Sequence, residues 1–135
     1  MKTPVEMLAS KRDGKGESVL ICGVDAVFGL LLERILHRAG VSEIYHTHTG
    51  EEALAFADRS HPGIILTEMR LPGMDGIELA DRLRGANSTS TFVMYDQPGD
   101  CPRNCAGAAG CIEKPVSERD LVALLERRLH GGAAT

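Results

Sequence analysis

Five short apolar segments alternate with segments of helical periodicity, and this alternation constrains the fold more than any other feature of the chain. Runs such as "SVLIC" and "GIILT" have the length and composition of buried strands. Strands that alternate with helices imply a parallel sheet with helices on both faces and right-handed crossovers. The predicted strands are 18–22, 41–47, 63–67, 91–95 and 110–113, and the predicted helices are 27–39, 50–60, 76–85 and 117 to about 130.

Length and charge narrow the class of protein. The chain has 135 residues and a formal net charge of -4, which fits one domain and gives no basic surface for nucleic acid. No apolar run approaches the roughly 20 residues that span a bilayer. The start of the chain also lacks the apolar centre of a signal peptide. We therefore expect a cytoplasmic protein with reduced thiols and no membrane contact. We expect a flexible lead over 1–17, one domain over 18–130 and a disordered tail over 131–135.

Candidate site residues follow the predicted strands. Ligands of an open parallel sheet bind beyond the carboxyl ends of its strands. The residues at those ends are Cys22 to Asp25 after the first strand, Glu68 at the third, Asp96 and Gln97 after the fourth, and Lys114 after the fifth.

Three longer motifs are typical of a known family. They are "TGEEALAFA" (49–57), "LPGMDGIELADRLR" (71–84) and "AGAAGCIEKP" (106–115), and they occur in the family's order at suitable spacing. Over about residues 18–130 the chain resembles the CheY-like receiver domain of bacterial response regulators. The resemblance implies a doubly wound, flavodoxin-like α/β fold whose five-stranded parallel sheet has the order 2-1-3-4-5.

The resemblance also implies a phosphorylation site. In the family, a cluster of acids binds Mg²⁺ and one aspartate takes a phosphoryl group from a histidine kinase. The metal neutralises phosphate charge, and a lysine offsets charge on the product. A Thr or Ser then bonds the phosphate, and a buried aromatic side chain follows that change.

This chain departs from the family pattern at most of these positions. The acid pair after the first strand aligns with Gly23 and Val24, which leaves Asp25 one place too late. The phosphoacceptor position holds Glu68, and the Thr or Ser position falls on Gln97, or on Asp96 if the strand is shifted by one. The aromatic position holds Cys111, and the lysine is retained as Lys114, followed by proline.

These departures predict a degenerate site. Mg²⁺ needs hard oxygen ligands in strict geometry, so the loss of two ligands should abolish binding. The extra methylene of Glu68 moves its carboxylate by about 1.5 Å. A misplacement of about 1 Å can cost about a hundredfold in rate. We expect no bound metal or other cofactor, no phosphorylation and no enzymatic activity.

Two roles for Glu68 follow from the resemblance. The carboxylate either contacts Lys114 and satisfies a cation left in an inactive site, or mimics a phosphorylated aspartate and keeps the domain active. We predict a contact between the Glu68 carboxylate and the Lys114 ammonium, either direct or bridged by water. The family also implies a cis peptide bond between Lys114 and Pro115.

The segment between Gln97 and Lys114 is shorter than is usual in this family. Its prolines and glycines predict mainly loop over 97–108, with the fourth helix shortened or missing. Cys101 and Cys105 lie there, and they could serve a thiol or metal sensor. Cys22 and Cys111 are predicted to be small core residues.

The resulting hypothesis is a pseudo-receiver that acts by protein–protein interaction in bacterial signalling. Its partner would be a histidine kinase, a phosphotransfer protein or an adaptor, and the domain itself a monomer or a homodimer. The thiol or metal sensor and the constitutively active phosphomimic are the alternatives.

Overall fold

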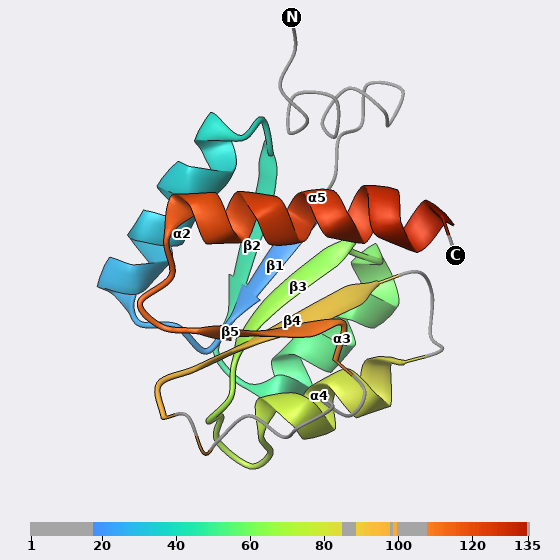
Figure 1. Ribbon diagram of the computed structural model, residues 1–135. Helices are drawn as coiled ribbons and strands as arrows, with labels where there is room; N and C mark the ends of the chain where they lie inside the picture. The colour runs from blue at the N-terminus through green and yellow to red at the C-terminus, as the bar shows by residue number, and fades with distance from the viewer. Residues whose placement is uncertain (1–17, 85–88, 98, 100–107, 135) are drawn as a thin grey trace, which may run out of the picture.

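A five-stranded parallel sheet forms the centre of the protein (Figure 1). The computed structural model describes residues 18–84, 89–97, 99 and 108–134. The sheet order is β2-β1-β3-β4-β5, which confirms the predicted doubly wound α/β fold. The strands are β1 (Ser18–Cys22), β2 (Glu43–Thr47), β3 (Ile64–Glu68), β4 (Ser90–Tyr95) and β5 (Gly110–Glu113).

Helices cover both faces of the sheet. Figure 1 shows α2 and α5 on one face and α3 and α4 on the other. Val19 and Ile21 of β1 pack in the core beneath α2 and α5, whereas Leu20 and Cys22 pack beneath α3 and α4. Both faces of β1 are therefore buried, which explains its continuous apolar sequence. The helices are α2 (Ala26–Arg38), α3 (Gly50–Ser60), α4 (Gly76–Leu83) and α5 (Glu118–Ala134).

The turn after α2 includes residues that were predicted to lie in the second strand, so β2 begins later than predicted. The N–H of Gly40 donates to the carbonyl of His37 at 3.0 Å, and the N–H of Val41 donates to that of Leu36 at 2.9 Å. These two bonds, with Gly40 at a φ of 98°, form a Schellman motif. Val41 is 2% exposed and closes this motif against the core, so β2 begins at Glu43 and not at 41.

Two other helix ends differ from the prediction. Helix α4 ends at Leu83, and α5 continues past His130 to Ala134. The end of α5 near 130 was therefore predicted too early, and the disordered tail over 131–135 stays a prediction. Four helices lie within the described residues, none of them between β4 and β5. The lead over 1–17 and most of the predicted 97–108 loop lie outside those residues.

A capping box holds the start of α3. The Thr49 hydroxyl accepts a hydrogen bond from the N–H of Glu52 at 3.1 Å. The Glu52 carboxylate in turn accepts from the N–H groups of Thr49 and His48. The hydrogen bond from His48 holds the pKa of Glu52 below its usual range. Each contact satisfies a helix-terminal donor that has no partner within the helix.

Replacing Thr49 with Ala should destabilise the domain by about 1 kcal/mol, because the Glu52 N–H loses its acceptor. Urea unfolding of the full chain measures this cost, and Thr49→Ser, which keeps the hydroxyl, is the matched control. Equal stability of Thr49→Ala and the wild type would show that the cap contributes nothing.

None of the helices in the described ranges is long and apolar enough to cross a membrane.

Candidate functional site

An ion pair between Glu68 and Lys114 forms the centre of the site. Glu68 is the last residue of β3, and Lys114 follows β5, so the sheet brings both side chains to the same edge. Lys114 Nζ lies 2.7 Å from Glu68 Oε1 and 2.8 Å from Oε2. The two side chains are only 18% and 15% exposed. The predicted contact is confirmed and is direct, and the Lys114–Pro115 bond is cis, as expected.

Two further side chains contact the Lys114 ammonium. Asp96, one residue beyond β4, places Oδ1 3.2 Å from Nζ. Its side chain is 66% exposed, so water screens this contact more than that with Glu68. The ring of Phe28 in α2 lies with its centroid 5.3 Å from Nζ, within the range of a cation–π contact. Side chains from α2, from the end of β3 and from the residue after β4 thus contact Lys114.

The electrostatics of the pair reflect its burial. Burial raises the pKa of the Glu68 carboxyl above its ordinary value, the nearby Asp96 and Asp25 carboxylates act in the same direction, and the attraction of Lys114 opposes them. Burial opposes the charge of Lys114, but the hydrogen bonds to Glu68 and Asp96 outweigh it and raise the pKa of that ammonium. Lys114 is therefore firmly cationic at neutral pH.

The residues after β1 do not fit a metal ion. Gly23 has a φ of 82°, and a Cβ there would lie 2.3 Å from Cδ2 of Leu71. Val24 packs against the core, and the Asp25 carboxylate caps α2 by accepting the Phe28 N–H at 2.8 Å. In the described part of the chain, no group of three or more His, Cys, Asp or Glu side chains could hold a metal.

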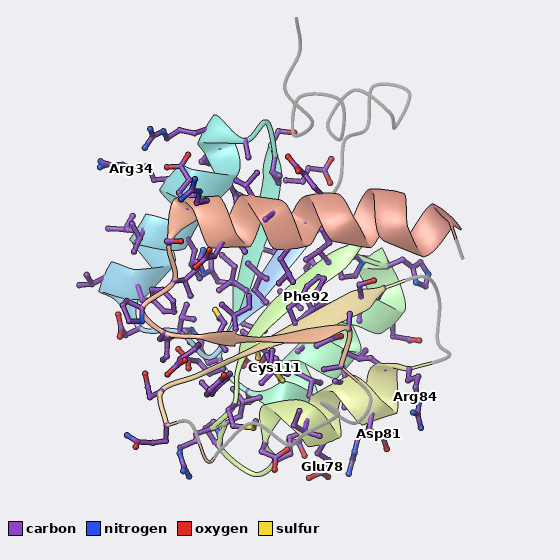
Figure 2. All side chains as sticks on the ribbon, viewed as in Figure 1. Arg34, Glu78, Asp81, Arg84, Phe92 and Cys111 are labelled. Atoms are coloured by element: carbon purple, nitrogen blue, oxygen red, sulfur yellow. The ribbon has the colours of Figure 1, made fainter. Side chains whose placement is uncertain are left out.

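Of the two candidate residues after β4, Asp96 contacts Lys114, and Gln97 is exposed. Cys22 is buried as predicted, and burial raises the pKa of its thiol. Cys111 is half-buried on the edge strand β5 (Figure 2), so the prediction of a core residue is wrong for it because a strand lies on only one side. Cys101 and Cys105 lie outside the described residues.

An open pocket of about 390 Å³ lies beside Lys114. Phe28 and Leu31 of α2 form one side, and Pro115 and Val116 form another. Asp25 and Asp96 place carboxylates at the same pocket. The contribution of α2 could not be predicted from the sequence, because no motif marks Phe28 and Leu31 and only the folded sheet brings them to Lys114.

The match to a family model covers residues 19–126 and identifies the response regulator receiver domain. The chain belongs to this family. Receiver domains are signalling modules of two-component systems, and they interact with histidine kinases or other proteins.

The chain matches only part of the length of its curated relatives. The tetrathionate response regulatory protein TtrR of Salmonella typhimurium is 38% identical over 84 residues, which cover 59% of this chain and 41% of that protein. The transcriptional regulatory protein TrcR of Mycobacterium tuberculosis is 29% identical over 128 residues, which cover 89% and 49%. The chain spans less than half the length of these relatives.

Solved structures agree on the fold. The signal receiver domain of a signal transduction histidine kinase from Syntrophus aciditrophicus superposes with a TM-score of 0.75 at 26% identity, covering 86% of this chain and 92% of that one. A CheY-like receiver domain from Methylobacillus flagellatus gives 0.75 at 17% identity, covering 83% and 98%, and this likeness concerns the fold alone.

Proposed function

We propose that this receiver domain is a pseudo-receiver: it takes no phosphoryl group and acts by binding a protein. The observation that carries the proposal is the pairing of both Glu68 carboxylate oxygens with Lys114, at 2.7 and 2.8 Å. In the family, this lysine serves the phosphorylated aspartate. Here a carboxylate of the chain itself occupies its ammonium.

The neighbouring positions support the same proposal. An acyl phosphate needs a cation to offset its charge during transfer. Gly23 and Val24 offer no oxygen ligand from their side chains, and Leu71 fills the space that a side chain at 23 would need. The site therefore lacks side-chain ligands for Mg²⁺ at positions 23 and 24, and phosphoryl transfer depends on that metal.

An exposed apolar surface supports the second half of the proposal. Val27, Leu30 and Leu31 of α2 are 80%, 68% and 46% exposed. They lie at helical spacing on one face, so they form a contiguous patch and not scattered single residues. Such patches mark contact surfaces for other proteins.

Incubation with a small phosphodonor and millimolar Mg²⁺ should leave the intact mass of the chain unchanged. Glu68→Asp should remain equally unmodified, because it shortens the acceptor but restores no metal ligand at 23 or 24. Intact-protein mass spectrometry at neutral pH measures both. A stoichiometric phosphoryl adduct on the wild type overturns the proposal, and an adduct on Glu68→Asp alone would show that the length of Glu68 is the only defect.

Glu68→Gln separates the pseudo-receiver from the constitutive phosphomimic. Gln keeps the shape but lacks the charge, so a phosphomimic would lose partner binding while the pseudo-receiver keeps it. The thiol or metal sensor depends on Cys101 and Cys105 and stays a prediction.

A further inference from the structure

We propose that the pocket beside Lys114 accepts an arginine side chain from a protein partner, while apolar residues of that partner lie on the exposed face of α2. The inference rests on the proposed function, because it assumes that the domain acts by binding protein. It goes further by naming the chemistry of the segment that binds. Arginine suits the pocket because its side chain joins a cationic head to an apolar stem.

The walls of the pocket suit the apolar stem. Phe28 and Leu31 belong to α2, and Pro115 and Val116 belong to the turn between β5 and α5. Figure 1 shows this turn passing the start of α2, where the two elements line the same pocket. The volume of about 390 Å³ lies at the lower end of the roughly 300 to 1,000 Å³ typical of ligand pockets. The pocket therefore suits one inserted side chain better than a large molecule.

The charges of the pocket suit the cationic head. The charged residues that line it are Asp25, Asp96 and Lys114. Glu68 balances the charge of Lys114 at 2.7 and 2.8 Å, so the two aspartates set the sign of the pocket. Asp25 accepts the N–H of Phe28, and Asp96 contacts the Lys114 ammonium. A carboxylate accepts up to about four hydrogen bonds, so both aspartates keep acceptors for a guanidinium group.

The sign of the charge separates arginine from other guests. A glutamate or a phosphate group would be repelled by both aspartates, and a neutral side chain would leave them without a counter-charge. A guanidinium group presents five N–H donors in a planar fork, so it can bind two carboxylates at once. The pocket is thus complementary to a cation, although it lies beside a lysine.

The apolar surface continues from the pocket along α2. Leu31 lines the pocket and is 46% exposed, and its neighbours Val27 and Leu30 are 80% and 68% exposed. A segment whose arginine enters the pocket therefore places its flanking residues over these side chains. Burial of the apolar residues contributes affinity, and the arginine selects among apolar segments by its charge.

Peptide titration of the full chain tests the inference. The probe is a blocked eight-residue peptide in which leucines flank one arginine, and two control peptides replace that arginine with citrulline or glutamate. Citrulline keeps the shape of arginine but has no charge. The arginine peptide should bind at least about fivefold more tightly than the citrulline peptide, and the difference should shrink as salt is added. Amide resonances of α2 and of residues 114–116 should shift during an NMR titration.

Conservative variants identify the charges that act. Asp25→Asn and Asp96→Asn keep the size of the side chain, and Asn remains a good N-cap for α2. Each should weaken binding of the arginine peptide about threefold and leave that of the citrulline peptide unchanged. Asp81→Asn, on the exposed part of α4 (Figure 2), is the matched control and should change neither. The amide spectrum of each variant confirms that it is folded.

Four outcomes overturn the proposal. Equal binding of the arginine and citrulline peptides assigns the surface to apolar contact alone, and tighter binding of the glutamate peptide makes Lys114 the group that sets the sign. Shifts confined to other elements overturn the choice of pocket. Resonances of α2 that shift with protein concentration, and not with any peptide, assign the surface to a second copy of the chain.

The two proposals fail separately. A phosphoryl adduct, read by mass, overturns the pseudo-receiver and leaves the order of peptide affinities as it is. Equal peptide affinities overturn the arginine site and leave the mass result as it is.

Discussion

Replacing Lys114 with Met should lower the free energy of unfolding by about 2 kcal/mol at pH 8, the largest effect expected from a change in the ion pair. Removing one member of a fully buried pair costs roughly 3 to 5 kcal/mol, and this pair keeps some contact with water. Among the residues that the structure describes, Glu68 would lose its only close cation while Asp25 and Asp96 continue to repel it. Urea unfolding of the full chain measures the cost.

Glu68→Gln should cost less, about 1 kcal/mol, because Lys114 keeps its contact with Asp96. The double variant should then be destabilised by less than the sum of the single variants, with a coupling of at least about 1 kcal/mol. The exposed pair of Arg82 and Glu78 is the matched control, and its coupling should be below about 1 kcal/mol. Strictly additive effects at 68 and 114 would show that the contact does not stabilise the fold.

Lys114→Met should also change how the free energy of unfolding depends on pH. The pKa of Glu68 is raised in the folded state, so the folded protein holds this proton more tightly than the unfolded chain. The stabilisation that comes from this proton on Glu68 is complete below the ordinary pKa of 4.5 and is lost as the pH rises through the raised pKa of the folded state. Without Lys114, that pKa rises further. Lys114→Met should therefore regain more stability between pH 8 and pH 5 than the wild type, and an equal change in both would contradict this account.

The wild type should lose stability above the ordinary lysine pKa of 10.5. The raised pKa of Lys114 means that its contribution is complete below this value and disappears as the pH passes through the folded pKa.

The sequence predicted the features that depend on periodicity and on strand ends. The strand order came from the resemblance, and the pairing of Glu68 with Lys114 followed because both lie at the carboxyl edge of the sheet. The role of Val41 was missed, because its apolar side chain fits a strand as well as a Schellman motif. The contacts of Phe28 and Asp96 with Lys114 depend on tertiary packing between elements far apart in the chain, which no local pattern encodes.

The position of the missing Mg²⁺ ligand shows most clearly what the sequence does not reveal. The sequence alone indicates that Gly23 has no side-chain carboxylate to bind the metal. It does not reveal that Leu71, from the loop after β3, fills the adjacent space. The missing carboxylate and the packed leucine are two separate obstacles, and they predict that a single substitution cannot restore the site.

Gly23→Asp should therefore destabilise the domain by about 3 kcal/mol and give no Mg²⁺ binding. The left-handed backbone contributes roughly 1 to 2 kcal/mol, and overpacking of the new side chain against Leu71 contributes roughly 1 to 3 kcal/mol. Urea unfolding measures the stability, and titration with Mg²⁺ followed by calorimetry measures binding.

Gly73→Asp is the matched control for the backbone contribution. Gly73 has the same φ of 82°, but a Cβ there meets no atom within 4 Å. It should cost only about 1 kcal/mol, since Asp tolerates the left-handed region better than most residues. The difference between the two variants then isolates the packing against Leu71, and Leu71→Ala in the Gly23→Asp background should recover that difference. Equal costs at 23 and 73 would show that Leu71 yields easily, and saturable Mg²⁺ binding by Gly23→Asp would show that the missing carboxylate is the only obstacle to the metal.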